Sequence, residues 1–114
     1  VLKNKHYLGL ASDQNAGQKG TKVKLLNSEV SIPKGAAIFH IKTKKPILVG
    51  FCILTPQLKY KLTLKEIDES IINDKKNDLI YNVNQYFSNL LEEEIKKYPE
   101  QYFWFHRKWT KDIY

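Results

Sequence analysis

Cysteine, methionine and long apolar runs are scarce or missing in this chain, and each scarcity excludes a class of protein. One cysteine in 114 residues excludes a framework of internal disulfides and fits a reducing compartment. The longest apolar run, Pro46 to Leu54, has nine residues, whereas a helix that spans a bilayer needs about 20. Methionine is absent, and the chain begins at Val1. We therefore expect part of one domain, excised from a longer protein, that does not itself cross a membrane.

Negative charge is scarce in the first part of the chain. Residues 1–66 hold twelve lysines against three carboxylates, a net charge of +9, whereas residues 67–114 carry −2. A basic surface indicates an anionic partner, such as nucleic acid, a phospholipid surface, a phosphorylated substrate or an acidic carrier protein. The alternative is that most of these lysines are simply solvated, as exposed charges usually are.

Four segments of the sequence have the patterns of β-strands. Residues 5–12 predict a short, mostly buried strand, and residues 46–54 predict a buried central strand. Residues 57–64 alternate apolar and polar side chains, which is typical of a strand with one buried face. The step at residues 55–56 suits a turn between these last two strands, and residues 21–26 predict an edge strand or an extended loop.

Two helices complete the predicted fold. Pro33 suits a first helical position with Ser31 as its cap, and this helix should end at the lysines before Pro46. A longer helix should end before Pro99, and its apolar stripe consists of Leu79, Ile80, Val83, Tyr86, Phe87, Leu90, Leu91 and Ile95. The predicted fold is therefore α/β: a fragment of a mixed β-sheet flanked by helices, with a long C-terminal amphipathic helix.

Residues 98–109 form an unusually aromatic and basic segment, Tyr-Pro-Glu-Gln-Tyr-Phe-Trp-Phe-His-Arg-Lys-Trp. It resembles the C-terminal block of the bacterial lipid A biosynthesis (lauroyl/myristoyl) acyltransferases, P-E-Q-[YW]-x-W-x-H-R-R-[FW], in the lysophospholipid acyltransferase-like superfamily. The motif positions are occupied by Glu100, Gln101, Trp104, His106 and Arg107. Lys108 stands where the family has a second arginine, which keeps the charge but loses the bidentate fork.

The loop at residues 13–20, Asp-Gln-Asn-Ala-Gly-Gln-Lys-Gly, follows the first predicted strand. Such loops at strand ends commonly carry function. The loop is similar to the third block of the same family, D-Q-[DN]-x-G-x-x-G, and the resemblance places Asp13 on the functional acidic position. From the residues alone, the alternative is that Asp13 caps a turn by bonding its own backbone.

Acyltransferases of this class use a His-x4-Asp/Glu pair, in which the carboxylate orients the imidazole that takes the proton from the acceptor hydroxyl. Five residues after the three histidines stand Ala11, Lys45 and Lys111, so no such pair is present. The general base is therefore expected outside this chain. His40 has no second ligand at helical spacing, and we expect it to be a packed or surface histidine rather than a metal ligand.

The resemblance implies that residues 1–114 are the C-terminal part of an acyltransferase domain whose histidine-containing half is absent. The implied reaction moves a fatty acyl group from acyl carrier protein to a hydroxyl of a lipid A precursor or related glycolipid, with no metal or cofactor. Asp13 would be an auxiliary catalytic residue. The substrate-binding residues would be Gln14, Gly17, Lys19, Gly20, His106 and Arg107.

The implied location is the cytoplasmic face of the bacterial inner membrane. The expected partners are acyl carrier protein, an anionic phosphorylated glycolipid and the membrane surface, the last through the missing N-terminal part. An exposed sheet edge would also allow the fragment to form a homodimer.

Two other functions fit the composition. A small basic nucleic-acid-binding module would agree with the net charge of +7 and the seven tyrosines. No recognised nucleic-acid motif accompanies that charge, so no nucleic-acid partner is expected. The isolated chain could also be an inactive fragment, because half of an active site does not turn over.

Overall fold

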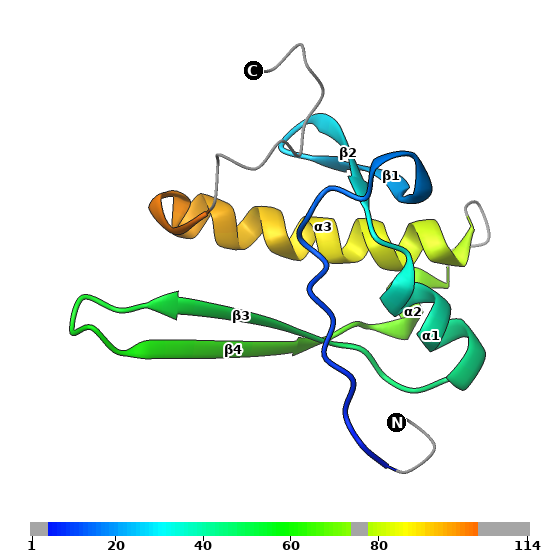
Figure 1. Ribbon diagram of the computed structural model, residues 1–114, viewed down its shortest axis with the longest axis horizontal. Coiled ribbons are helices and arrows are strands. Elements are labelled where there is room, and N and C mark those ends of the chain that lie inside the picture. The colour runs from blue at the N-terminus through cyan, green and yellow to red at the C-terminus, as the bar shows by residue number, and fades with distance from the viewer. Residues whose placement is uncertain (1–4, 74–77, 103–114) are drawn as a thin grey trace.

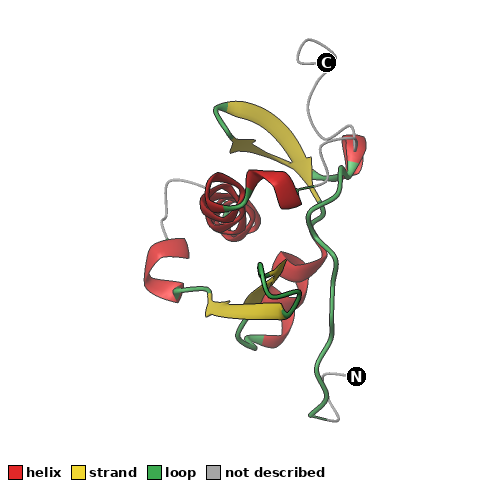
Figure 2. Ribbon diagram, turned by 90° about the vertical axis from the view of Figure 1, so that its left-hand side faces the viewer, coloured by secondary structure: helices red, strands yellow, loops and turns green. Residues whose placement is uncertain are grey.

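In the computed structural model, which describes residues 5–73 and 78–102, a long helix lies between two β-hairpins (Figures 1 and 2). The elements in chain order are the 3-10 turn η2 (Gly17–Lys19), β1 (Thr21–Leu25), β2 (Ser28–Ile32), α1 (Gly35–Thr43), β3 (Leu48–Leu54), β4 (Tyr60–Glu66), α2 (Glu69–Ile72), α3 (Leu79–Lys97) and the 3-10 turn η3 (Pro99–Gln101). Both sheets are antiparallel pairs, β1–β2 and β3–β4. The predicted α/β class and the long C-terminal helix are confirmed. No described helix is long and apolar enough to cross a bilayer.

The first hairpin confirms the extended segment predicted at residues 21–26 and adds β2, which was not predicted. Leu26 and Asn27 form its two-residue turn with φ values of 51° and 63°. Positive φ at both positions is typical of a type I′ turn, whose twist matches that of the strands it joins. The inward side chains of this hairpin, Val23, Leu25, Val30 and Ile32, are buried against α3.

Side chains of α3 bond to the backbone of β1, along the edge that β2 does not cover, and to the backbone of the turn that follows β1. Gln85 accepts from the Lys24 N–H (2.9 Å) and donates to the Lys24 carbonyl (3.0 Å). Ser88 Oγ donates to the same carbonyl at 2.6 Å, and Glu92 accepts from the Leu26 N–H at 2.9 Å. These bonds satisfy backbone groups that would otherwise lose their partners on burial. The helix thus substitutes for a third strand.

The core consists of two buried clusters on different sides of α3. One joins β1 and β2 to Leu91 and Ile95, and the other joins Ala37 of α1 and Val49 of β3 to further residues of α3. Phe51 and Phe87, both half-buried, contact both clusters. The apolar stripe predicted for α3 therefore serves two layers, and Asp78 caps the helix by accepting from the Ile80 N–H at 2.8 Å.

The start predicted for the first helix is wrong. The helix α1 begins at Gly35 rather than at Pro33, and Ser31 belongs to β2 instead of capping the helix. The reason is that the Ser31 hydroxyl donates to the Gly17 carbonyl at 2.6 Å, which ties it to the preceding loop. The predicted end is confirmed, because Lys44 adopts a left-handed conformation (φ 56°) and its N–H bonds to the His40 carbonyl at 2.8 Å.

The strand predicted at residues 5–12 is also wrong. These residues have no strand conformation, and Tyr7 is 94% exposed. The segment crosses the molecule without joining either sheet (Figure 1). An apolar segment is stable as a strand only where a neighbouring strand completes its hydrogen bonds.

The second hairpin confirms both of its predicted strands but not their burial. Only Val49 of β3 is buried, and Cys52 is exposed. On β4 the predicted buried positions Leu62 and Leu64 are exposed as well. The reason is that α3 packs on the face that carries Val49 and Phe51, whereas Leu62 and Leu64 lie on the opposite face.

The bonds of α3 to Lys24 predict a non-additive effect on stability. We expect Gln85→Leu and Ser88→Ala each to lower the free energy of unfolding by about 1 kcal/mol. The double variant should lose more stability than the sum of the two single losses, because only the double variant leaves the Lys24 carbonyl without a donor from α3. Urea unfolding of all four proteins measures this coupling, and additive losses would contradict the arrangement.

Glu92 predicts how stability depends on pH. The Lys96 ammonium, 2.8 Å away, and the Leu26 N–H hold the pKa of the Glu92 carboxyl below its ordinary value of 4.5. The charged form therefore stabilises the fold above pH 4.5, and this contribution is lost as the pH falls through the lowered pKa. We expect Glu92→Gln to lower stability at pH 7 and to match the parent more closely at about pH 3 in urea unfolding. Glu29→Gln, on the exposed side of β2, is the control and should change stability by less than about 0.5 kcal/mol.

Candidate functional site

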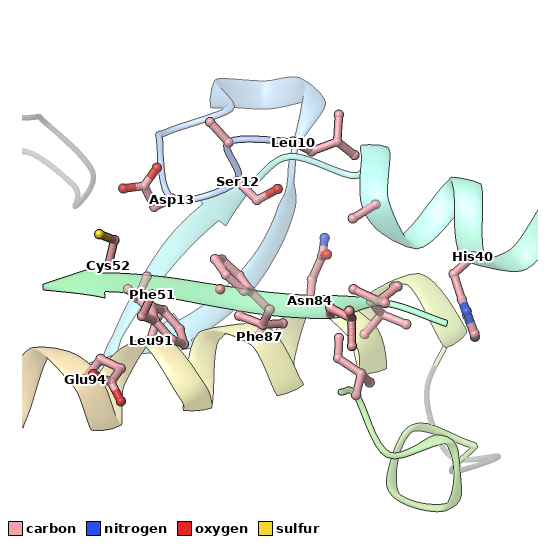
Figure 3. A pocket seen from close by; sticks show the side chains of 18 of the residues that line it. Leu10, Ser12, Asp13, His40, Phe51, Cys52, Asn84, Phe87, Leu91 and Glu94 are labelled. Atoms are coloured by element: carbon pink, nitrogen blue, oxygen red, sulfur yellow. The ribbon is translucent and has the colours of Figure 1, made fainter. Parts of the chain in front are cut away.

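A cavity of about 460 Å³ lies between the N-terminal segment with α1, strand β3 and helix α3 (Figure 3). Its walls are mainly apolar, and they include Leu10, Phe51, Phe87 and Leu91. The volume lies in the range of small-molecule sites, which are usually concave and apolar with a few polar groups. This cavity is therefore the candidate site among the described residues.

Polar side chains from three different elements stand at the cavity wall. Asp13 on the N-terminal segment and Glu94 on α3 lie toward one end, and His40 on α1 lies toward the other (Figure 3). The Glu94 side chain is only 12% exposed and has Lys97 Nζ 3.6 Å from its carboxylate. Asn84 is buried, with its amide donating to the Pro33 carbonyl at 3.4 Å. The cavity thus combines an apolar interior with carboxylates at one end.

His40 is a packed histidine, as predicted. Its ring is buried, and its Nδ1 lies 2.8 Å from the Lys45 carbonyl. A carbonyl only accepts, so Nδ1 carries the proton and donates. The other ring nitrogen lies 4.0 Å from a carboxylate oxygen of Glu69. Within residues 5–73 and 78–102, no three His, Cys, Asp or Glu side chains gather as a metal site would require.

The loop after Asp13 is fixed on β2 by its own hydrogen bonds. Gly17 has a φ of +60°, which suits glycine, and its N–H donates to Asn15 Oδ1 at 2.9 Å. The Ala16 N–H bonds to the Ser31 carbonyl at 3.2 Å. Gly20 packs so closely that an added Cβ would lie 2.8 Å from the Ile32 carbonyl. Both glycines are therefore required by the conformation of the loop.

The structure brings only part of the predicted site to the cavity. Asp13 lines it, whereas Gln14, Gly17, Lys19 and Gly20 do not. Gln14 and Lys19 are exposed at the surface beside the site. His106 and Arg107 lie outside the described residues, so their predicted role stays a prediction.

Glu94 and Asn84 were missed in the sequence although a signal for them existed. Both lie on the apolar stripe of α3. Glu94 comes three residues after Leu91, and Asn84 comes directly after Val83. A polar residue on the buried side of an amphipathic helix requires a partner or a function. Periodicity alone shows the stripe but not which of its members meet a cavity.

Gln101, in the aromatic terminal block, bonds to the free edge of β3. Its side-chain amide accepts from the Leu54 N–H at 2.8 Å and donates to the Leu54 carbonyl at 2.9 Å. Gln85 bonds to Lys24 of β1 in the same way. One side chain thus makes the two bonds that a neighbouring strand would make, and it fixes the end of β3 beside the cavity.

The packing around Gly20 predicts that the loop and the position of Asp13 depend on this residue. We expect Gly20→Ala to lower the free energy of unfolding by about 1–3 kcal/mol, because its Cβ meets backbone that cannot move aside cheaply. Gly9→Ala is the matched control, since nothing lies within 4 Å of its added Cβ. Thermal or urea unfolding measures both variants. Equal stabilities would show that Gly20 is not required for packing.

The sequence was compared with known protein families and with curated proteins. The family described as bacterial lipid A biosynthesis acyltransferase matches residues 1–111, nearly the whole chain. No curated protein matches the sequence.

Proposed function

Because this chain belongs to the bacterial lipid A biosynthesis acyltransferase family, we propose that it forms the C-terminal part of a domain that acylates a lipid A precursor or related glycolipid. The acyl donor in this proposal is the thioester of acyl carrier protein. The observation that carries the proposal is the position of Asp13, which the family motif marks as functional and which lines an apolar cavity. A carboxylate at the wall of a cavity with apolar side chains is placed to orient an acceptor hydroxyl beside a bound acyl chain.

The cavity supports a site for a fatty acyl chain. Phe51, Phe87 and Leu91 supply aromatic and aliphatic walls without charge. Burial of a hydrocarbon chain against such walls is favourable by about 0.8 kcal/mol per CH₂ group. The polar groups at the cavity ends would then mark where the chain stops and the reacting head begins.

In the proposed reaction, the acceptor hydroxyl oxygen forms a bond to the thioester carbonyl carbon and the carbon–sulfur bond breaks. A histidine in the part of the enzyme outside this chain takes the hydroxyl proton, which then passes to the leaving thiolate. Asp13 acts as an auxiliary residue by accepting a hydrogen bond from the acceptor or by holding its cationic partner. This separates the roles: the base removes the proton, and Asp13 orients the group that loses it.

The basic part of the chain supports recognition of the phosphates of the acceptor. Lys19 lies in the loop that begins at Asp13, and Lys22 and Lys24 continue the basic surface on β1. Lysine is a common point-charge partner of phosphate. Gln14 belongs to the same proposed surface, and the family resemblance assigns substrate binding to His106 and Arg107 as well. The proposed location is the cytoplasmic face of the inner membrane. On this proposal the isolated chain turns over no substrate, since the base lies elsewhere.

The proposal predicts that the carboxylate of Asp13 is needed for turnover but not for folding. We expect Asp13→Asn in the complete enzyme to reduce acyl transfer at least about 100-fold, the usual scale for loss of a positioned polar group at the reacting centre. The assay follows a labelled acyl group from its carrier protein to the phosphorylated glucosamine acceptor. Glu29→Gln, an exposed carboxylate on β2, is the control and should keep parental activity. Parental turnover by Asp13→Asn with unchanged unfolding would contradict the role.

A further inference from the structure

One wall of the cavity is a stripe on α3 that is apolar in the middle and polar at both ends. Four lining residues follow each other at helical spacing: Glu94, Leu91, Phe87 and Asn84. Leu91 and Phe87 belong to the part of the wall that the proposed function assigns to the acyl chain. Glu94 and Asn84 therefore delimit that part, with Glu94 on the side of Asp13 (Figure 3).

Asn84 keeps one hydrogen-bonding atom available to a ligand. The residue is only 3% exposed, and its amide nitrogen lies 3.4 Å from the Pro33 carbonyl. A carbonyl only accepts, so the nitrogen of the amide and not its oxygen faces Pro33. In the described part of the chain no donor bonds to the remaining Oδ1, and the single fully buried side-chain atom without a partner is Thr21 Oγ1. The Asn84 Oδ1 is therefore not fully buried, and it opens into the cavity that Asn84 lines.

The bond to Pro33 accounts for only half of this amide. A structural role, which ties α3 to the segment between β2 and α1, requires the donor nitrogen alone. The oxygen has no such role, although a polar atom on the buried side of a helix requires a partner or a function. The function therefore has to come from what enters the cavity.

An available carbonyl oxygen in an apolar wall discriminates between the groups of a ligand. A hydroxyl that reaches Oδ1 donates to it, whereas a methylene group that covers it removes it from water and offers no bond. Leaving a buried acceptor unsatisfied weakens binding about 5- to 150-fold. Burial of one further CH₂ group strengthens binding only about fourfold. A saturated chain therefore gains affinity along Leu91 and Phe87 and loses it on reaching Asn84.

The geometry of α3 gives the chain length at which this change occurs. Asn84 and Glu94 stand about 15 Å apart along the helix axis, at a rise of about 1.5 Å per residue. With carbon–carbon bonds of about 1.5 Å in an extended zigzag, about twelve carbons span this distance. The carbonyl carbon of such a chain would lie at the end where Asp13 stands, and its methyl group would lie just short of Asn84.

We propose that Asn84 is a specificity-determining residue that limits the acyl chain in the cavity to about twelve carbons. The limit is chemical and not steric: Asn84 penalises a chain that covers Oδ1 and accepts a chain that offers it a donor. The inference rests on the proposed function, because it takes the apolar cavity as the acyl site and the Asp13 end as the reacting end. It adds a selection by length from a residue that lies outside the blocks at residues 13–20 and 98–109.

The first test measures affinities of thioesters that differ only in chain length. S-acyl pantetheine thioesters from octanoyl to tetradecanoyl are titrated calorimetrically into the full chain. We expect the dissociation constant to fall about fourfold with each added CH₂ group up to dodecanoyl. It should then rise at least about fivefold from dodecanoyl to tetradecanoyl. A fall that continues unchanged to tetradecanoyl would overturn the proposal.

A hydroxylated ligand tests the oxygen of the amide in the parent chain alone. The terminal hydroxyl of a 12-hydroxydodecanoyl thioester reaches Asn84 and can donate to Oδ1. We expect this thioester to bind about as tightly as the dodecanoyl thioester, because a site with a hydrogen-bond partner for a hydroxyl compensates its desolvation. Binding at least about tenfold weaker than that of dodecanoyl would contradict an available acceptor at this position. This measurement needs no variant, so it remains decisive if substitution of Asn84 impairs folding.

Asn84→Leu replaces the amide by an apolar side chain of similar size. In this variant we expect tetradecanoyl to bind at least about tenfold more tightly than in the parent, and 12-hydroxydodecanoyl to bind at least about tenfold more weakly than dodecanoyl. Asn89→Leu is the matched control, since Asn89 is exposed on α3 and does not line the cavity. It should keep the parental order of affinities. Circular dichroism confirms that both variants are folded.

The outcomes separate this inference from the proposed function. A length limit that persists in folded Asn84→Leu would overturn the role of Asn84 and leave the acyl site in place. Absence of binding by every thioester would overturn the acyl site and the length limit together. In either case the turnover of Asp13→Asn in the complete enzyme decides the proposed acyl transfer independently, because that assay does not depend on the length of the chain.

Discussion

The fold depends on how the free edges of two-stranded sheets obtain hydrogen-bond partners. A hairpin of two strands leaves backbone groups on its outer edges, and burial of such groups without partners is costly. Gln85 and Ser88 of α3 supply these partners to Lys24 of β1, and Glu92 supplies one to Leu26 in the turn that follows. Gln101 supplies them to Leu54 of β3. The helix is therefore held by directional bonds as well as by its apolar stripe. This explains how 19 residues of helix fix two separate hairpins.

This edge bonding also creates the candidate site. With β1 tied along α3 and the end of β3 tied to η3, the N-terminal segment and α1 close a cavity over β3. The loop that carries Asp13 is held in turn by Gly17, Gly20 and the Ser31 hydroxyl on β2. The cavity therefore lies along β3, and side chains from both faces of this strand, among them Phe51 and Cys52, line it. In our proposal this cavity binds an acyl chain.

Much of the fold follows from local patterns. The stripe of α3, the turn at Thr55 and both strands of the second hairpin are correct, because periodicity and turn chemistry act over a few residues. The strand at residues 5–12 and the burial of Leu62 and Leu64 are wrong, because apolar composition shows that a segment can be buried but not what covers it. Glu94 was missed for a related reason: its importance comes from a cavity formed by segments distant in sequence.

The sequence by itself determined the family and the α/β class, since the blocks at residues 13–20 and 98–109 and the helical period are readable without coordinates. It also marked Asp13 as the residue of interest. Only the tertiary structure decided that Asp13 lines an apolar cavity, that Gln101 completes the edge of β3 and that Leu62 and Leu64 of the second hairpin are exposed. Each of these facts is a contact, or the lack of one, between segments that lie tens of residues apart. A linear pattern carries no information about which distant backbone group a side chain will meet.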